Sequence, residues 1–145
     1  MMRRILLGYD GSESASHALE FAVDLARRCG AELHLLAVAR PPEFGDEVET
    51  AAVIENGQRQ CEKVLAAARA RLAQEGLQTA FRVAVGHPAE QIVRDAEAHA
   101  IDHIVVAQPE ITPALLAVRG FELVYRDASI AVLSRRQPAA AVRAP

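Results

Sequence analysis

Aromatic residues are scarce in this sequence. Phe and Tyr together make up 4% of the 145 residues and there is no Trp, whereas hydrophobic residues as a class reach 51%. The core must therefore be aliphatic and rich in alanine, because these residues supply nearly all of the apolar surface that folding can bury. A chain of this length predicts one domain with a sizeable core.

Cysteine is also scarce. Cys29 and Cys61 have neither the number for a disulfide framework nor the spacing of a metal site. Both fall on the apolar face of a predicted helix, so we expect buried thiols. The histidines are scattered among predicted helices and strands and do not form the i, i+4 pair on one helix that binds zinc. We therefore expect no bound metal.

Long hydrophobic runs and blocks of positive charge are both missing. No stretch reaches the ~18 consecutive apolar residues of a membrane span. The apolar run that begins at Ile5 is far shorter than the ~7–15 residues of a signal-peptide core. A formal net charge of −3 without a basic block disfavours nucleic-acid binding. We expect a cytoplasmic protein that binds neither nucleic acid nor membrane.

The most informative stretch is the first predicted strand and the turn that follows it. Ile5–Leu7 is an uninterrupted apolar run, which is typical of a strand buried on both faces in a parallel sheet. Asp10, Gly11 and Ser12 form a turn, and a helical pattern begins immediately afterwards. This arrangement brings polar groups to the carboxyl end of a sheet, where open α/β sheets bind ligands.

The rest of the chain alternates between helical and strand patterns. Helices are predicted over residues 14–29, 48–75, 88–100 and 113–126, the last one bent near Gly120, and strands over residues 31–39, 77–85, 102–107 and 129–134. Such alternation predicts an α/β fold with an open five-stranded parallel sheet, right-handed crossovers and helices on both faces. We expect residues 1–136 to form the domain and residues 137–145 a flexible tail.

The third predicted strand indicates the strand order. Its hydrophobicity alternates and Arg82 lies on its polar side, facing outward, so we expect this strand at an edge of the sheet. The predicted order is 3-2-1-4-5, which reverses direction between the first and fourth strands. A ligand crevice is therefore expected between Asp10–Ser12 and Gln108–Thr112.

Three segments match a known family pattern: the opening Arg4–Glu13 (RILLGYDGSE), the turn Gly86–Ile92 (GHPAEQI) and the strand Ile101–Val106 (IDHIVV). Together they resemble the universal stress protein family, and the resemblance extends over nearly the whole chain up to about Pro109. The resemblance implies the five-stranded fold, a homodimer and, in many members, ATP binding.

The chain departs from the ATP-binding members after the fourth strand. The resemblance implies two glycines three residues apart there, and a later glycine followed by Ser or Thr, because backbone without a β-carbon lets amides approach phosphates closely. Gln108 and Ile111 occupy the first two positions, and Phe121 follows Gly120. The sequence therefore predicts that the phosphate cradle is absent and that ATP binds weakly or not at all.

The candidate crevice residues come from the ends of the predicted strands: Tyr9, Asp10, Gly11, Ser12, Val38, Gly86, His87 and Gln108. In nucleotide-binding relatives, the position of Asp10 accepts a hydrogen bond from the ribose or adenine, and the position of Val38 lies near the adenine. Asp10 bonding only the amides of its own turn is an equally good interpretation. Val38 is more simply a core valine, and His87 a helix-capping histidine. No Gly-x-Ser-x-Gly motif surrounds the nearby serines, so we expect no nucleophilic catalysis.

Two functions are compatible with these patterns, and a third is set aside. The first is a universal stress-type regulatory or protective protein, a non-enzymatic dimer with a degenerate nucleotide site, no required cofactor and an unidentified protein partner. The second is a switch or enzyme that uses AMP, adenosine or ATP through an unusual phosphate loop. The third is a phospho-receiver domain, which needs an Asp after the third strand and a Lys after the fifth. Gly86 and Ser134–Arg135 stand there instead.

The last strand is the predicted homodimer interface. Residues 129–134 are apolar at Ile130, Val132 and Leu133, and we expect them at the sheet edge opposite the third strand. An edge strand exposes unpaired amides and carbonyls, which pair readily with another chain. A two-fold axis would run the two copies antiparallel. The family resemblance implies the same interface.

Overall fold

The computed structural model describes residues 2–43, 45–107, 112–117 and 120–136. In these ranges the elements follow one another as β1 (Arg4–Gly8), α1 (Glu13–Cys29), β2 (Glu32–Ala39), α2 (Glu47–Leu72), β3 (Thr79–Val85), α3 (Pro88–Ala98), β4 (His103–Val106), α4 (Thr112–Ala117), β5 (Phe121–Arg126) and β6 (Ala131–Arg135). The predicted tail, residues 137–145, lies outside the described residues.

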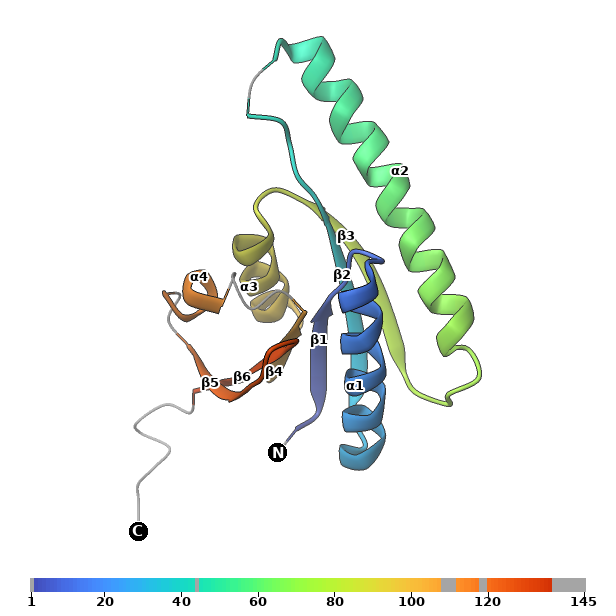
Figure 1. Cartoon of the computed structure of the whole chain (residues 1–145), viewed down its shortest axis with the longest axis vertical. Coiled ribbons are helices and arrows are strands. Elements are labelled where there is room, and N and C mark those ends of the chain that lie inside the picture. The colour runs from blue at the N-terminus through green and yellow to red at the C-terminus, as the bar shows by residue number, and fades with distance from the viewer. Residues whose placement is uncertain (1, 44, 108–111, 118–119, 137–145) are drawn as a thin grey trace.

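The strands form one mixed sheet in the order β3-β2-β1-β4-β6-β5 (Figure 1). The first four strands are parallel, whereas β6 runs antiparallel to β4 and β5 runs antiparallel to β6. The predicted α/β fold, the position of β3 at an edge and the reversal between β1 and β4 are confirmed. The prediction of five strands, all parallel, is wrong at the carboxyl-terminal end.

The predicted helix over residues 113–126 accounts for this difference. The helix α4 ends at Ala117, Gly120 takes a φ of 112°, and the next six residues form β5. Asp127 then closes a tight turn, since its Oδ1 accepts hydrogen bonds from the amides of Ser129 (2.7 Å) and Ile130 (2.9 Å). The result is a β5–β6 hairpin, which explains why β6 runs antiparallel to β4 instead of following a crossover helix.

The hairpin also changes which strand lies at the edge. β6 lies between β4 and β5, so the prediction that residues 129–134 form an edge is wrong. Ile130, Val132 and Leu133 are at most 5% exposed, because they pack inside the chain. They are therefore unavailable to a partner while β5 stays paired with β6.

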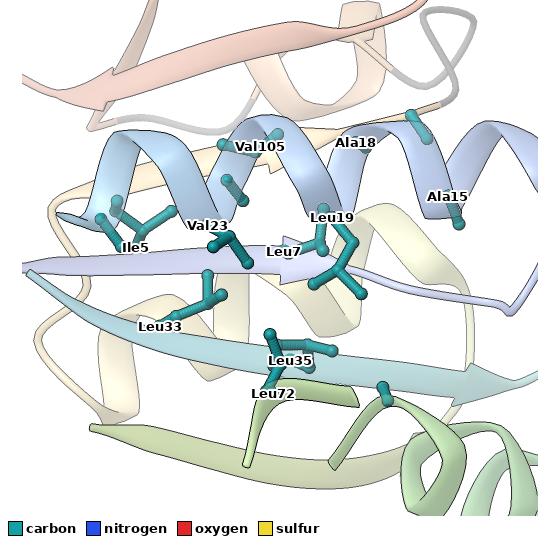
Figure 2. Packing of buried hydrophobic residues seen from close by; sticks show 14 of the residues in the cluster. Ile5, Leu7, Ala15, Ala18, Leu19, Val23, Leu33, Leu35, Leu72 and Val105 are labelled. Atoms are coloured by element: carbon teal, nitrogen blue, oxygen red, sulfur yellow. The ribbon is translucent and has the colours of Figure 1, made fainter. Parts of the chain in front are cut away.

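Helices cover both faces of the sheet (Figure 1). α1 and α2 pack on one face, where Figure 2 shows Leu7 and Leu35 of the sheet against Leu19 of α1 and Leu72 of α2. α3 and α4 cover the other face, around Leu6, Leu36, Ile92, Ile104, Leu115 and Leu133. Ile5, Leu6 and Leu7 of β1 point to opposite faces in turn and are fully buried on both, as the apolar run predicts. No helix in the described ranges is long and apolar enough to cross a membrane.

Two side chains differ from their predicted environments. Cys29 is exposed rather than buried, because it is the last residue of α1 and lies beyond Ala26, the last buried one; Cys61 is partly buried. Arg82 does not face open solvent, because it makes a bidentate pair with Asp95 of α3, with both N–O distances 2.7 Å. The outward position predicted for Arg82 is therefore wrong: α3 covers that face of β3.

Candidate functional site

The turn after β1 is held by its own polar groups. The Tyr9 amide donates to the Leu36 carbonyl (2.9 Å) and so extends the pairing of β1 with β2. Asp10 Oδ1 accepts a hydrogen bond from the Ser12 amide (2.9 Å), and Ser12 Oγ accepts one from the Ala15 amide (3.1 Å) and caps α1. Asp10 thus orders its turn, as one of the two interpretations predicts, and its exposed side chain still lies at the carboxyl end of β1.

Gly11 lets this turn approach α2 closely. Its φ is 79°, in the left-handed region, and a β-carbon at this position would lie 3.0 Å from both γ-carbons of Val64. Only glycine combines this backbone conformation with so close a contact at low cost. The turn that carries Asp10 is therefore fixed against α2 on one side and leads directly into α1 on the other.

The end of β3 and the start of α3 form the opposite side of the site. The Gly86 amide donates to the Ala39 carbonyl (3.0 Å), which joins the ends of β3 and β2. His87 occupies the N-cap position of α3, but its side chain makes no capping hydrogen bond. Pro88 begins the helix, a position where its missing amide hydrogen costs nothing.

A cavity of about 520 Å³ lies at the carboxyl ends of β1, β2 and β4. Its described lining consists of Gly8, Tyr9, Asp10, Ala15, Leu36, Val38, Arg40, Pro88, Ile92, Val106 and Ala107. The location is the point between β1 and β4 where the strand order reverses, which is where open α/β sheets bind ligands. The walls are mostly aliphatic, and one carboxylate and one guanidinium provide the charges.

The structure brings some of the predicted site residues together and not others. Tyr9, Asp10 and Val38 line the cavity, whereas Gly11 and Ser12 shape the turn beside it. Gly86 and His87 do not line it, although the next residue, Pro88, does. Gln108, and with it the predicted loss of the phosphate cradle, lies outside the described residues.

Arg40 is the main residue that the sequence reasoning missed. Arg40 directly follows β2, and Asp10 lies two residues after the end of β1. Polar residues at the carboxyl end of a strand are the signal that pointed to Asp10, and the same signal at the second strand points to Arg40. The other missed residues, such as Ile92 and Val106, are aliphatic members of helix and strand patterns that carry no separate signal. Among the described residues, no group of three His, Cys, Asp or Glu side chains is arranged to hold a metal ion.

Comparison with known proteins supports the resemblance seen in the sequence. The model of the universal stress protein family matches residues 1–115. The chain belongs to this family. It is 29% identical over 127 residues to the universal stress protein YxiE of Bacillus subtilis, with 77% of this chain and 82% of that protein covered.

Solved structures of the family have the same fold. A universal stress protein from Burkholderia pseudomallei is 28% identical, with a TM-score of 0.61 and coverage of 79% of this chain and 87% of that one. UspA from Lactobacillus plantarum is 25% identical, with a TM-score of 0.63 and coverage of 73% and 77%. The cavity at the ends of β1, β2 and β4 is therefore part of a universal stress protein fold.

Proposed function

We propose that this universal stress protein is a non-enzymatic regulatory protein that binds a small adenine nucleotide in the cavity beside Asp10. The observation that carries the proposal is the cavity itself, which combines aliphatic walls for a base with a carboxylate for ribose hydroxyls. Its volume of about 520 Å³ is that of a small-molecule site. Asp10 accepts hydrogen bonds, which suits a diol that donates them.

Relatives of the same fold support the choice of ligand class. Universal stress proteins have been solved in complex with cAMP, with AMP in the Arabidopsis thaliana protein, and with dAMP in an Archaeoglobus fulgidus protein. Their identities to this chain are 21%, 14% and 16%, so they share its fold and offer a ligand class to test.

The non-enzymatic part of the proposal comes from the chemistry of the lining. The described lining contains no Ser, Cys or His, so it offers no nucleophile paired with a base. Asp10 is its single carboxylate, whereas acid–base catalysis by carboxylates commonly uses two with different pKa values. A homodimeric state and a cytoplasmic location remain predictions.

Isothermal titration calorimetry with adenosine, AMP, cAMP and ATP tests the binding. We expect saturable binding of at least one adenine ligand by the wild type and a loss of at least about tenfold in Asp10→Ala, in line with the loss of a charge-assisted hydrogen bond. Asp24→Ala is the matched control, since Asp24 is an exposed carboxylate on α1 that pairs with Arg28 outside the cavity.

Two results would overturn the proposal. One is the absence of saturable heat for all four ligands up to about 1 mM, where binding contributes only about 4 kcal/mol. The other is binding that Asp10→Ala leaves unchanged. Chromatography of the nucleotides after incubation tests the non-enzymatic part, and turnover that depends on the protein would contradict it.

A further inference from the structure

Arg40 provides the positive charge in the described lining of the cavity. Arginines elsewhere in the described chain are mostly paired, as Arg28 is with Asp24 and Arg94 with Glu90. Arg40 is exposed and makes no ion pair or hydrogen bond with any described residue. Arg40 therefore lines a mostly apolar cavity, and the donors of its guanidinium are free of described partners and available to a ligand.

The backbone that carries Arg40 is fixed on several sides. The preceding residue, Ala39, accepts a hydrogen bond from the Gly86 amide (3.0 Å). The β-carbon of Ala39 also lies close to Gly57 of α2, since a β-carbon added at Gly57 would be 3.3 Å from it. Pro41 and Pro42 follow and restrict the backbone further. The backbone of Arg40 is therefore held at the cavity, and only the side-chain torsions need to be ordered on binding.

The two charged residues of the lining act differently on a phosphorylated ligand. Asp10 and Arg40 follow the neighbouring strands β1 and β2, so both charges lie at one end of the sheet. Asp10 repels a phosphate and accepts hydrogen bonds from hydroxyl groups, whereas a guanidinium binds phosphate oxygens in bidentate fashion. One phosphate group matches one guanidinium, whereas a triphosphate would bring further negative charges that no described lining residue neutralises.

We infer that Arg40 is the phosphate-binding residue of this cavity and that the site selects nucleotides with a single phosphate over nucleosides and triphosphates. This inference depends on the proposed function, because it names the ligand class of the same cavity. Hydroxyl groups of the ligand face Asp10, and its phosphate faces Arg40.

The test compares AMP with adenosine in calorimetry, for the wild type and for Arg40→Gln. Arg40→Gln removes the charged contact, so it should weaken the binding of AMP about tenfold or more. Its affinity for adenosine should stay within about twofold of the wild-type value. Arg40→Lys keeps the charge without the bidentate geometry, so its affinity for AMP should lie between those of the wild type and Arg40→Gln. Arg3→Gln is the matched control, because Arg3 is exposed and precedes β1, at the opposite end of the sheet.

Each remaining outcome has a defined meaning. Equal losses for AMP and adenosine in Arg40→Gln, or no loss for either, would overturn the role of Arg40. Wild-type binding of Mg-ATP tighter than that of AMP would overturn the preference for one phosphate. Inorganic phosphate that binds as tightly as AMP would show a phosphate site rather than a nucleotide site. Failure of the wild type to bind either AMP or adenosine would instead overturn the proposed function.

Discussion

Gly11 is the residue whose backbone most directly determines the shape of the site. Gly11→Ala should lower the free energy of unfolding by about 2 kcal/mol, because alanine at a φ of 79° is strained and its β-carbon meets Val64. Gly76→Ala is the control, since Gly76 has a φ of 70° but nothing within 4 Å of an added β-carbon. It should cost only about 1 kcal/mol, the backbone part alone. Urea unfolding measures both, and equal costs would mean that the contact with Val64 has no effect.

Asp10 has a smaller structural role in the same turn. One of its contacts is the hydrogen bond from the Ser12 amide, which resembles a capping bond. Asp10→Ala should therefore lower the free energy of unfolding by about 1 kcal/mol. A much larger loss of free energy of unfolding, measured by thermal or urea unfolding, would show that Asp10 is mainly a structural residue. The proposed ligand site would then be left without its hydrogen-bond acceptor.

At the scale of elements, a polar cluster joins β2 and β3 to α3. The side chain of Asp95 on α3 is 9% exposed and accepts two hydrogen bonds from the Arg82 guanidinium. Asp95→Asn should lower the free energy of unfolding by about 3 kcal/mol, because it leaves the partly buried guanidinium without a counter-charge. Arg94→Ala, which removes an exposed pair with Glu90, should change it by less than about 1 kcal/mol. Similar costs for the two variants in urea unfolding would contradict this difference.

The same cluster makes stability depend on pH through His34. This buried side chain lies with Nε2 3.1 Å from Glu32 Oε1 and Nδ1 2.9 Å from Arg82 Nη2. Burial is the main cause that lowers the pKa of His34 below 6.5, and the Arg82 charge adds to it, whereas Glu32 and Asp95 oppose it. His99 of α3 also lies near, with ring centroids 6.4 Å apart. At acidic pH the His34 ring therefore takes up a proton more readily in the unfolded chain than in the folded one.

The sign of the effect follows from the lowered pKa. The contribution of His34 to the free energy of unfolding is fully present above pH 6.5. It is lost as the pH falls from 6.5 through the lower pKa that His34 has in the folded state. We expect urea unfolding to show a falling free energy of unfolding in that window, and His34→Gln to flatten the slope. His17→Gln, at an exposed position on α1, should leave the slope unchanged. An equal slope in wild type and His34→Gln would show that His34 is not responsible.

At the scale of the whole molecule, the sheet leaves two edges, β3 and β5, for pairing with a second copy. β5 carries exposed apolar side chains at Leu123, Val124 and Tyr125. If the predicted homodimer pairs two strands, it must use one of these edges rather than β6, and the exposed apolar residues favour β5. The irregular register between Leu123 and Tyr125 limits regular pairing, so we expect a dimer that dissociates on dilution.

Light scattering at tens of micromolar protein tests the dimer. Val124→Lys should shift the mass from dimer to monomer, because two lysines would meet near the two-fold axis. Thr79→Lys, at the exposed start of β3, is the control and should leave the mass unchanged. A monomeric wild type would contradict the homodimer, and a dimeric Val124→Lys would place the interface elsewhere.

The first four strands, three helices and the end of the sheet where the cavity lies can all be predicted from the sequence. Local patterns are sufficient for these features: Ile5–Leu7 is too apolar for any place but the centre of a sheet, and Gly30 and Pro88 mark where helices end and begin. The parallel direction of β1 and β2 then places Asp10 and Val38 at one end of the sheet.

The other features cannot be predicted in this way, because they depend on contacts between residues far apart in the chain. Phe121–Arg126 suits a helix or a strand by its own pattern, and its pairing with β6 selects the strand. The alternating pattern of the third strand predicts a solvent-facing Arg82, whereas in the structure Asp95 of α3 pairs with it. Arg40 follows the second predicted strand, and it is part of the site only because β1, β2 and β4 end around one cavity. Side-chain partners across a sheet are set by packing and register, which a local pattern does not contain.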